Sequence, residues 1–307
     1  MADDWINIAL RFAVYMDLAA TFGVALFGVY ALRLDGRSPP IAQRYARAVA
    51  AGAILGIVLS ACSMAVLAKA MSGAESYGEL TSHIFEMVIS ETPVGVAWTI
   101  RLVALAACAG LALSKLRIAY RLIGAAALSA MALATMAWSG HGAMSTGAQG
   151  YLHLASDIAH LLAAGAWVGA LLAFVMLATQ RAATTAESVE LLSRLSNGFA
   201  QVGTVIVATL LVTGIGNYLL IVGASVTPIF TTLYGGLLAL KLALFVGMLG
   251  LAAANRFQLS PRLELALSGG DHAQAAVLLR RSLVLEASMV VLVIACVAWL
   301  GVLSPGK

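Results

Sequence analysis

Long apolar runs recur along the whole chain, separated by short polar segments, and this pattern predicts its elements. Each run reaches the length of about 20 residues that an α-helix needs to cross a bilayer. Transmembrane barrels alternate apolar and polar positions instead, so the runs indicate an all-α, polytopic membrane helix bundle. We predict eight transmembrane spans: Ile6–Leu32, Arg44–Ala68, Val94–Leu113, Ile118–Trp138, Leu152–Thr179, Phe199–Val222, Tyr234–Ala254 and Ser282–Leu300.

The composition supports this class, because 62% of the residues are hydrophobic and only 10% are charged. Soluble domains carry roughly 45–50% and 25%, respectively. No linker rich in Pro, Gly or Ser divides the chain, so we expect a single transmembrane domain over residues 1–307. The first run is too long for a cleavable signal peptide, and Asp3 and Asp4 stand where such a peptide would be basic.

The charges between the spans orient the bundle, since cytoplasmic loops of membrane proteins are rich in Lys and Arg. The longest loop on the opposite side is acidic, with Glu75, Glu79, Glu86 and Glu91. We therefore predict a bacterial inner-membrane protein with both termini periplasmic. The net charge of +4 belongs to the cytoplasmic loops and does not indicate nucleic-acid binding. The basic residues of these loops are Arg33, Arg37, Arg44, Arg47, Lys115, Arg117, Arg121, Arg181, Arg194, Arg256, Arg262, Arg280 and Arg281.

Three of the five histidines fall close together around the start of the fifth span. His153, Asp157 and His160 are spaced i, i+4 and i+7, which places two imidazoles and a carboxylate on one helix face. The uncharged, glycine-rich segment before this span carries His141 and Met144 and can fold back over its outer end. Ionisable groups at a membrane helix indicate a functional site, because hydrocarbon disfavours them.

Imidazole, carboxylate and thioether groups together suit a transition metal, copper in particular. We therefore predict that His141, Met144, His153, Asp157 and His160 bind copper, as Cu(I) or Cu(II). Asp157 can either bind the metal directly or orient a ligating imidazole.

Two more residues are weighed as additional ligands of this copper site. His83 lies in the outer loop Lys69–Thr92, which can carry a short helix. Met64 lies near the outer end of the second span.

Four further ionisable groups lie inside the predicted spans: Arg11, Asp17, Arg101 and Lys241. Counted at about 1.5 Å per residue, all but Asp17 reach the depth of the histidine cluster in the outer half of the bundle. Asp17 lies deeper, near the middle of the bilayer. This polar layer can be part of a transport path or a set of structural ion pairs.

Two other features are interpreted as structural. Glu286 enters the last span from the basic side, where Arg256 or Arg281 can pair with it. Gly-xxx-Gly pairs such as Gly165 and Gly169 are too frequent among the 29 glycines to identify a helix interface.

Five motifs in the second half of the chain form a recognisable pattern: Thr231-Thr-Leu-Tyr-Gly235-Gly-Leu-Leu-Ala-Leu-Lys241, Ala254-Asn-Arg256, Pro261-Arg262-Leu, Arg280-Arg281 with Glu286, and His160-Leu-Leu-Ala-Ala-Gly-Ala-Trp167. With these motifs the chain resembles the copper resistance protein D (CopD) family over residues 138–300. The resemblance implies an inner-membrane protein of copper homeostasis and resistance that moves copper from the periplasm toward the cytoplasm. It also implies a small periplasmic copper-binding partner of the CopC type, which is not fused to this chain.

Two other functions stay open at this point. The chain can be a membrane redox protein that is linked to quinone or binds a b-type haem, with Arg11, Arg101 and Lys241 holding the haem propionates. It can also be a copper sensor or scaffold that binds the metal without conducting it. We expect no enzyme, since the sequence offers no nucleophile–base set and no phosphate-binding loop.

Overall fold

The computed structural model describes residues 2–35, 39–140, 147–179, 186–224, 227, 231–259 and 272–303. These segments form nine α-helices and three short helical turns, and they contain no strand. The helices are α1 (Ala2–Asp35), α2 (Pro39–Ser72), α3 (Ser82–Glu91), α4 (Pro93–Leu113), α5 (Ile118–Ala134), α6 (Gly147–Ala178), α7 (Ala186–Ile221), α9 (Leu233–Ala254) and α11 (His272–Leu300), with the turns η1 (Tyr77–Glu79), η2 (Thr135–Ser139) and η4 (Asn255–Leu259).

Eight of these helices are long and apolar enough to cross a membrane, which confirms the eight predicted spans. The bounds differ by little more than one helical turn. The second span begins at Pro40, since proline is tolerated in the first turn of a helix. The α6 helix begins at Gly147, whose positive φ of 67° favours glycine, and so it extends past the predicted Leu152.

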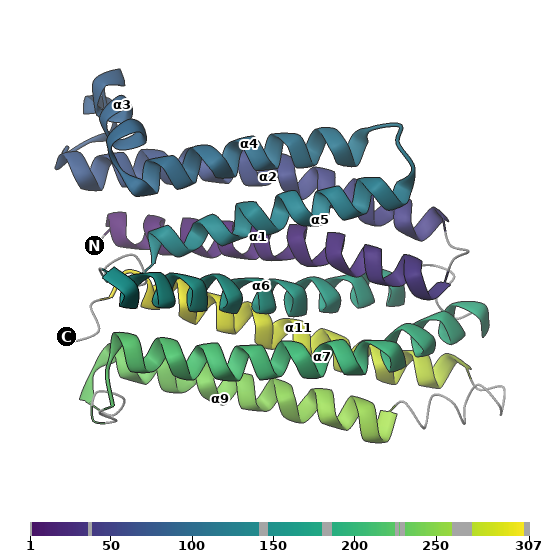
Figure 1. Cartoon of the computed structure of the whole chain (residues 1–307). Helices are drawn as coiled ribbons and strands as arrows, with labels where there is room; N and C mark the ends of the chain where they lie inside the picture. The colour runs from purple at the N-terminus through teal and green to yellow at the C-terminus, as the bar shows by residue number, and fades with distance from the viewer. Residues whose placement is uncertain are drawn as a thin grey trace.

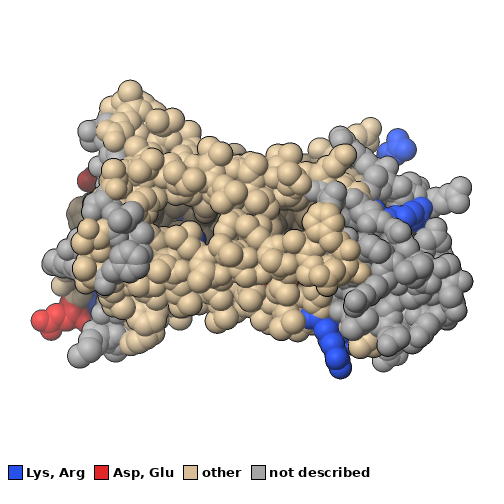
Figure 2. All heavy atoms as spheres, turned by 90° about the horizontal axis from the view of Figure 1, so that it is seen from below, with Lys and Arg blue, Asp and Glu red and all other residues tan. Residues whose placement is uncertain are grey.

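The eight long helices run side by side, and α3 lies at one end of the bundle (Figure 1). The first turn of α1 and the last turn of α11 meet at that same end, where the rings of Trp5 and Trp299 are 5.5 Å apart. Figure 2 shows exposed basic side chains at the opposite end of the molecule. Among the described residues of the basic loops, those with exposed side chains include Arg44, Arg47, Lys115, Arg117, Arg194, Arg280 and Arg281.

The segment between α2 and α4 carries the acidic residues of the termini end and forms the short helix α3, as predicted. The Ser76 hydroxyl donates to Glu79 at 2.9 Å, and this bond holds the pKa of that carboxyl below its ordinary value. The segregation of acidic and basic residues to opposite ends agrees with the predicted orientation. Which membrane face each end meets stays a prediction.

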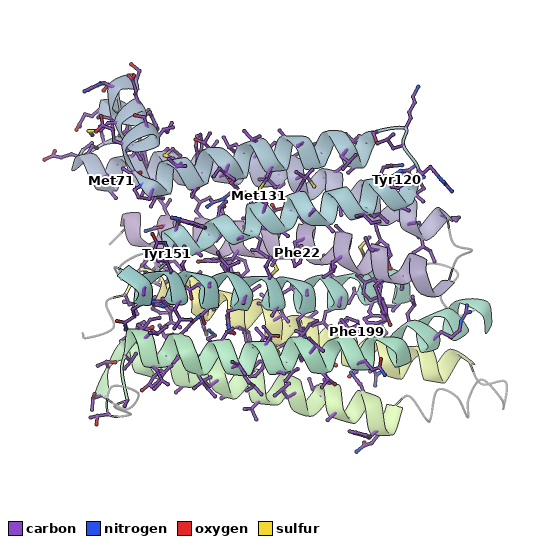
Figure 3. The ribbon with its side chains drawn as sticks, in the orientation of Figure 1. Phe22, Met71, Tyr120, Met131, Tyr151 and Phe199 are labelled. Atoms are coloured by element: carbon purple, nitrogen blue, oxygen red, sulfur yellow. The ribbon has the colours of Figure 1, made fainter. Side chains whose placement is uncertain are left out.

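Helix α1 lies at the centre of the core and packs against α2, α5, α6 and α11. Near the basic end, Phe27 is surrounded by aromatic rings, with centroids 4.9 Å from Phe174 and 6.1 Å from Phe199. In Figure 3, Phe22 points into the bundle whereas Tyr120 lies on its surface, in agreement with exposed fractions of 7% and 60%.

The closest approach of α1 to α6 is made by glycines. A Cβ on Gly23 would overlap the Gly165 carbonyl oxygen and would stand 2.6 Å from the Gly169 Cα. The pair Gly165 and Gly169, which the sequence alone did not distinguish from other glycine pairs, therefore forms this helix crossing. The crossing sets how α6, with its ionisable residues, stands against α1.

Candidate metal site

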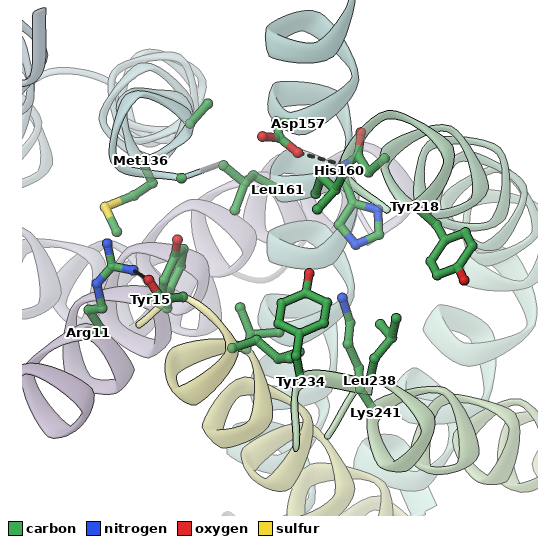
Figure 4. Close-up of a pocket in the computed structure, with 18 of the residues that line it drawn as sticks. Arg11, Tyr15, Met136, Asp157, His160, Leu161, Tyr218, Tyr234, Leu238 and Lys241 are labelled. Atoms are coloured by element: carbon green, nitrogen blue, oxygen red, sulfur yellow. Dashed lines mark hydrogen bonds between the residues drawn. The ribbon is translucent and has the colours of Figure 1, made fainter. Parts of the chain in front are cut away.

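A cavity of about 180 Å³ opens at the termini end of the bundle, between α1, η2, α6, α7, α9 and α11. Its wall is apolar except for one group of polar side chains. Figure 4 shows Asp157 and His160 side by side on α6, facing Tyr234 and Lys241 from α9. The polar lining residues are Arg11, Tyr15, Asp157, His160, Asn217, Tyr218, Tyr234 and Lys241.

Helix α7 holds the two ionisable groups of α6 in place. Asn217 donates its Nδ2 to Asp157 Oδ1 at 2.6 Å, and Thr213 Oγ1 lies 2.9 Å from His160 Nδ1. Gly214 of α7 lies beside the ring, since a Cβ on it would stand in ordinary van der Waals contact with the imidazole Cε1, at 3.6 Å. The Asn217 amide oxygen is buried, and no described residue bonds to it.

The hydrogen bonds of Thr213 determine which ring nitrogen of His160 carries the proton. The Thr213 hydroxyl donates to the Thr209 carbonyl at 2.6 Å, so its oxygen is left to accept from the imidazole. His160 therefore donates from Nδ1, and in the neutral ring the lone pair is on Nε2. A metal-binding histidine has this arrangement, with one nitrogen held by a hydrogen bond and the other available to the metal.

The third member of the predicted helix face, His153, has a different environment. Its side chain is 1% exposed, and it is not among the residues that line the cavity. It lies on α6 nearer to the termini end of the bundle, about 6 Å before Asp157 along the helix. The i, i+4, i+7 spacing thus brings Asp157 and His160 into one cavity and leaves His153 packed beside it.

The two basic groups of the cavity are held differently. Arg11 donates to the carbonyl oxygens of Gly301 and Ser139, each at 2.8 Å, and so ties α1 to the end of α11 and to η2. Lys241 reaches the cavity from α9, beside Tyr234 (Figure 4). The lining thus presents two cations and one carboxylate.

The other two members of the predicted polar layer lie away from this cavity. Arg101 is buried on α4 and donates its Nε to Thr135 at 2.8 Å. Asp17 is buried where α1 crosses α2, beside Gly52 and Gly56. The residues of the predicted polar layer thus belong to separate sites. Their depth along each helix was predicted from the sequence, but depth does not determine which neighbouring helix a side chain faces.

The additional ligand candidates also lie apart from the cavity. Met64 belongs to a small apolar cluster with Ala68 and Val88, and His83 is exposed on α3. His141 and Met144 lie outside the described residues. Among the residues that the structure describes, no three His, Cys, Asp or Glu side chains gather closely enough to hold a metal ion.

Glu286 and its neighbours form a second polar group near the basic end of the bundle. Asn255 donates to Glu286, and Ser282 donates to Asn255 Oδ1 at 2.5 Å. The described partner of Glu286 is an amide, since the π-helical turn η4 brings Asn255 against α11. The side chain of Arg256, one of the two predicted partners, lies outside the described residues.

Sequence reasoning missed the residues of α7 and the tyrosines that complete the cavity. Asn217 is the one amide residue away from the ends of its span. It could have been identified from the sequence, because hydrocarbon disfavours polar groups within a membrane helix. Thr213 gave no signal, since threonine is frequent in apolar helices and only its contact with His160 distinguishes it.

Comparison with known proteins gives the family. A family model described as "Copper resistance protein D" matches residues 193–300, and one described as "Copper resistance protein D-like, N-terminal domain" matches residues 1–151. "Copper resistance protein D" of Pseudomonas syringae pv. tomato is 44% identical over 304 residues, which cover 99% of this chain and 98% of that protein. The chain belongs to the copper resistance protein D family.

A second relative in the comparison is "Inner membrane protein YebZ" of Escherichia coli (strain K12). It is 29% identical over 258 residues, which cover 84% of this chain and 85% of that protein. No solved structure matches the chain. Family membership confirms the resemblance predicted from residues 138–300 and extends it over the first half of the chain, where the sequence offered mainly the number of spans.

Proposed function

We propose that this member of the copper resistance protein D family binds a copper ion in the cavity at the termini end and passes it inward across the membrane. The copper is the cargo of the protein. His160 Nε2 and Asp157 would bind it from α6, and His141 and Met144 would close the site from the segment before α6.

The observation that carries this proposal is the hydrogen-bond chain from His160 through Thr213 to Thr209. It leaves a lone pair on Nε2, which is the form of histidine that binds a metal. Close by, Asp157 and the unbonded amide oxygen of Asn217 supply acceptors for the metal or for a water molecule on it.

The position of Gly140 supports the contribution of His141. Gly140 lines the cavity, and a Cβ built on it would stand 3.9 Å from Asp157 Oδ2. His141 is the next residue of the chain, and consecutive Cα atoms are about 3.8 Å apart. A ligand set of His141, Asp157 and His160, with Met144 as a soft thioether, would then suit copper.

His153 and Lys241 would have supporting roles. His153, about one turn nearer the outer end than Asp157, would take part in receiving the ion. Lys241 would weaken the binding through charge repulsion. A site with moderate affinity suits a protein that loads and releases its cargo better than one that stores it.

The family and the charge pattern support the rest of the proposal. We place the chain in the bacterial inner membrane with both termini periplasmic, because the basic residues lie at the end opposite the cavity. Copper would then move from the periplasm to the cytoplasm, with a periplasmic protein of the CopC type as donor. We expect no enzymatic activity.

The size of the cavity weighs against the redox alternative. Sites for larger organic ligands have volumes of about 300–1,000 Å³, whereas this cavity has about 180 Å³, room for an ion and a few waters. The remaining alternative is a copper sensor or scaffold, which would use the same ligands without conducting the ion.

Copper binding and copper uptake, measured on the same protein, test the proposal. The wild type should bind about one copper per chain and accumulate copper in proteoliposomes, and His160→Ala should lose both properties. His83→Ala, a histidine exposed on α3, is the matched control and should retain both. Binding without uptake in the wild type would favour the scaffold, and equal binding in wild type and His160→Ala would refute the site.

A further inference from the structure

Asp17 is a carboxyl group buried near the centre of the membrane, in a notch made by glycines. It lies about 18 Å along α1 from Trp5, close to the middle of the 27-residue span Trp5–Ala31. Only 8% of its surface is exposed. A Cβ on Gly56 of α2 would stand 2.6 Å from Asp17 Oδ2, and one on Gly52 would stand 3.6 Å from Oδ1. The absence of side chains at these two positions makes room for the carboxyl group.

The carboxyl oxygen Asp17 Oδ2 is buried without a hydrogen-bond partner among the described residues. On α2, one helical turn after Gly56, Ser60 Oγ is buried and unpartnered as well. Buried polar groups in folded proteins nearly always have a partner, so the orphan carboxyl oxygen indicates a proton or a bound species.

No charge close by offsets a carboxylate at this position, and Asp17 has no ion-pair partner in the described part of the chain. On α4, the residue that approaches the notch is the apolar Leu105. The polar residues of this helix have other partners, since Arg101 donates to Thr135 and Cys108 donates to the Ala125 carbonyl.

In the described part of the chain, the other helices around Asp17 present no titratable group at its level. On α1 itself, Tyr15 lies two residues away and lines the outer cavity. Helix α6 places Gly165 against Ala19, and its nearest titratable residue is His160, five residues before that contact. An ionised Asp17 would therefore be an unpaired charge at the centre of the bilayer, which hydrocarbon strongly disfavours.

We propose that Asp17 is a proton-binding site at the centre of the membrane, and that the proton it carries couples to copper movement. The role in coupling rests on the proposed transport of copper, whereas the bound proton does not. In the neutral form, Oδ2 carries the hydrogen and acts as a donor. Release of that proton toward one side and uptake from the other would link the carboxyl group to the pH gradient across the membrane.

Infrared spectroscopy of the purified full-length protein, free of copper, tests the bound proton. The wild type at pH 7 should show the C=O band of a protonated carboxylic acid, which Asp17→Asn removes and Glu286→Gln leaves in place. The same band should persist when sodium is added at constant pH. The absence of an acid band that depends on Asp17, or its loss on adding sodium, would overturn the proposal.

Isotope labelling keeps the test decisive if Asp17→Asn does not fold. With carboxyl-¹³C aspartate incorporated, the band of the otherwise unchanged protein should shift, because it belongs to an aspartate. It should also survive Asp157→Asn, which removes the other aspartate of the spans. A band that does not shift with the label, or that disappears in Asp157→Asn, would contradict the assignment to Asp17.

Proteoliposome assays test the coupling separately from the copper site. Asp17→Asn should bind copper with the affinity of the wild type, while its uptake should lose the several-fold dependence on a pH gradient that the wild type shows. Uptake by Asp17→Asn that still responds to the gradient would overturn the coupling. If the wild type does not transport copper at all, the proposed function fails while the infrared result stands.

Discussion

The outer cavity and the crossing of α1 with α2 both hold a buried aspartate, yet the two carboxyl groups have opposite surroundings. Asp157 receives a hydrogen bond from Asn217 and shares its cavity with Arg11, His160 and Lys241. Asp17 lies in a notch between two helices, where none of the described residues pairs with it.

This difference shows how one bundle can treat the same side chain in two ways. A carboxylate among cations and hydrogen-bond donors keeps its charge and can help to bind a metal ion. A carboxyl group in a dry notch has no such compensation and is stabilised by a proton. We therefore assign copper to the cavity at the termini end and the proton to the notch between α1 and α2.

The largest expected effect comes from the helix crossing on which both regions depend. Gly23→Ala should destabilise the protein by about 1–3 kcal/mol or prevent folding, since the new Cβ overlaps the Gly165 carbonyl oxygen. Thermal unfolding in detergent measures this. The control is Gly110→Ala, where nothing lies within 4 Å of the new Cβ, and it should be neutral or slightly stabilising. Equal stability of the two variants would contradict the packing described for α1 and α6.

Acidification should weaken the outer site. A metal needs neutral imidazoles, and a histidine with the ordinary pKa of about 6.5 takes up a proton below that pH and so competes with copper. If His141 binds, copper affinity should fall about tenfold between pH 7.5 and 5.5, as measured by competition with a chelator of known affinity. An affinity that stays constant from pH 8 to pH 5 would exclude His141 as a ligand.

Exchanging each aspartate for asparagine compares the two regions directly. Asp157→Asn should weaken copper binding by about 10–100-fold, the range expected for a ligand or for a group that orients one. Asp17→Asn should leave the affinity unchanged, because Asp17 does not line the cavity. Equilibrium titrations of both variants measure the difference. Similar losses of copper affinity in the two variants would indicate that both aspartates contribute to one copper site.

Removal of the positive charge on α9 should have a smaller effect of opposite sign. Lys241→Gln should raise copper affinity by roughly tenfold, because the lysine repels a cation in the same cavity. Arg101→Gln is the comparison at another buried cation, which does not line the cavity, and it should leave the affinity unchanged. A lower affinity in Lys241→Gln would mean that the lysine supports the bound species.

The sequence predicted the membrane-spanning helices well for a physical reason. A helix that crosses the hydrocarbon core needs a continuous run of apolar residues, and such a run can be recognised directly in the sequence. It also placed Asp157 and His160 on one face, because helical spacing alone relates residues three and four apart.

Contacts between helices could not be predicted in the same way. Nothing in the local pattern distinguished Arg101, whose partner is Thr135 in η2, from Arg11, which lines the cavity. Gly165 and Gly169 could be recognised as a packing interface only once the structure placed Gly23 of α1 against them. Met64 shared the depth of the histidines but faces Val88 instead. Such pairings depend on the rotation of each helix about its axis, which apolar runs leave open.

The most direct test of the outer copper site is metal analysis with a visible spectrum, on the purified wild type and on the double variant His153→Ala, His160→Ala. We expect about one copper per chain in the wild type, none in the double variant, folded protein in both, and no Soret band. Equal copper in both proteins, or a Soret band in the wild type, would contradict a copper site built on α6.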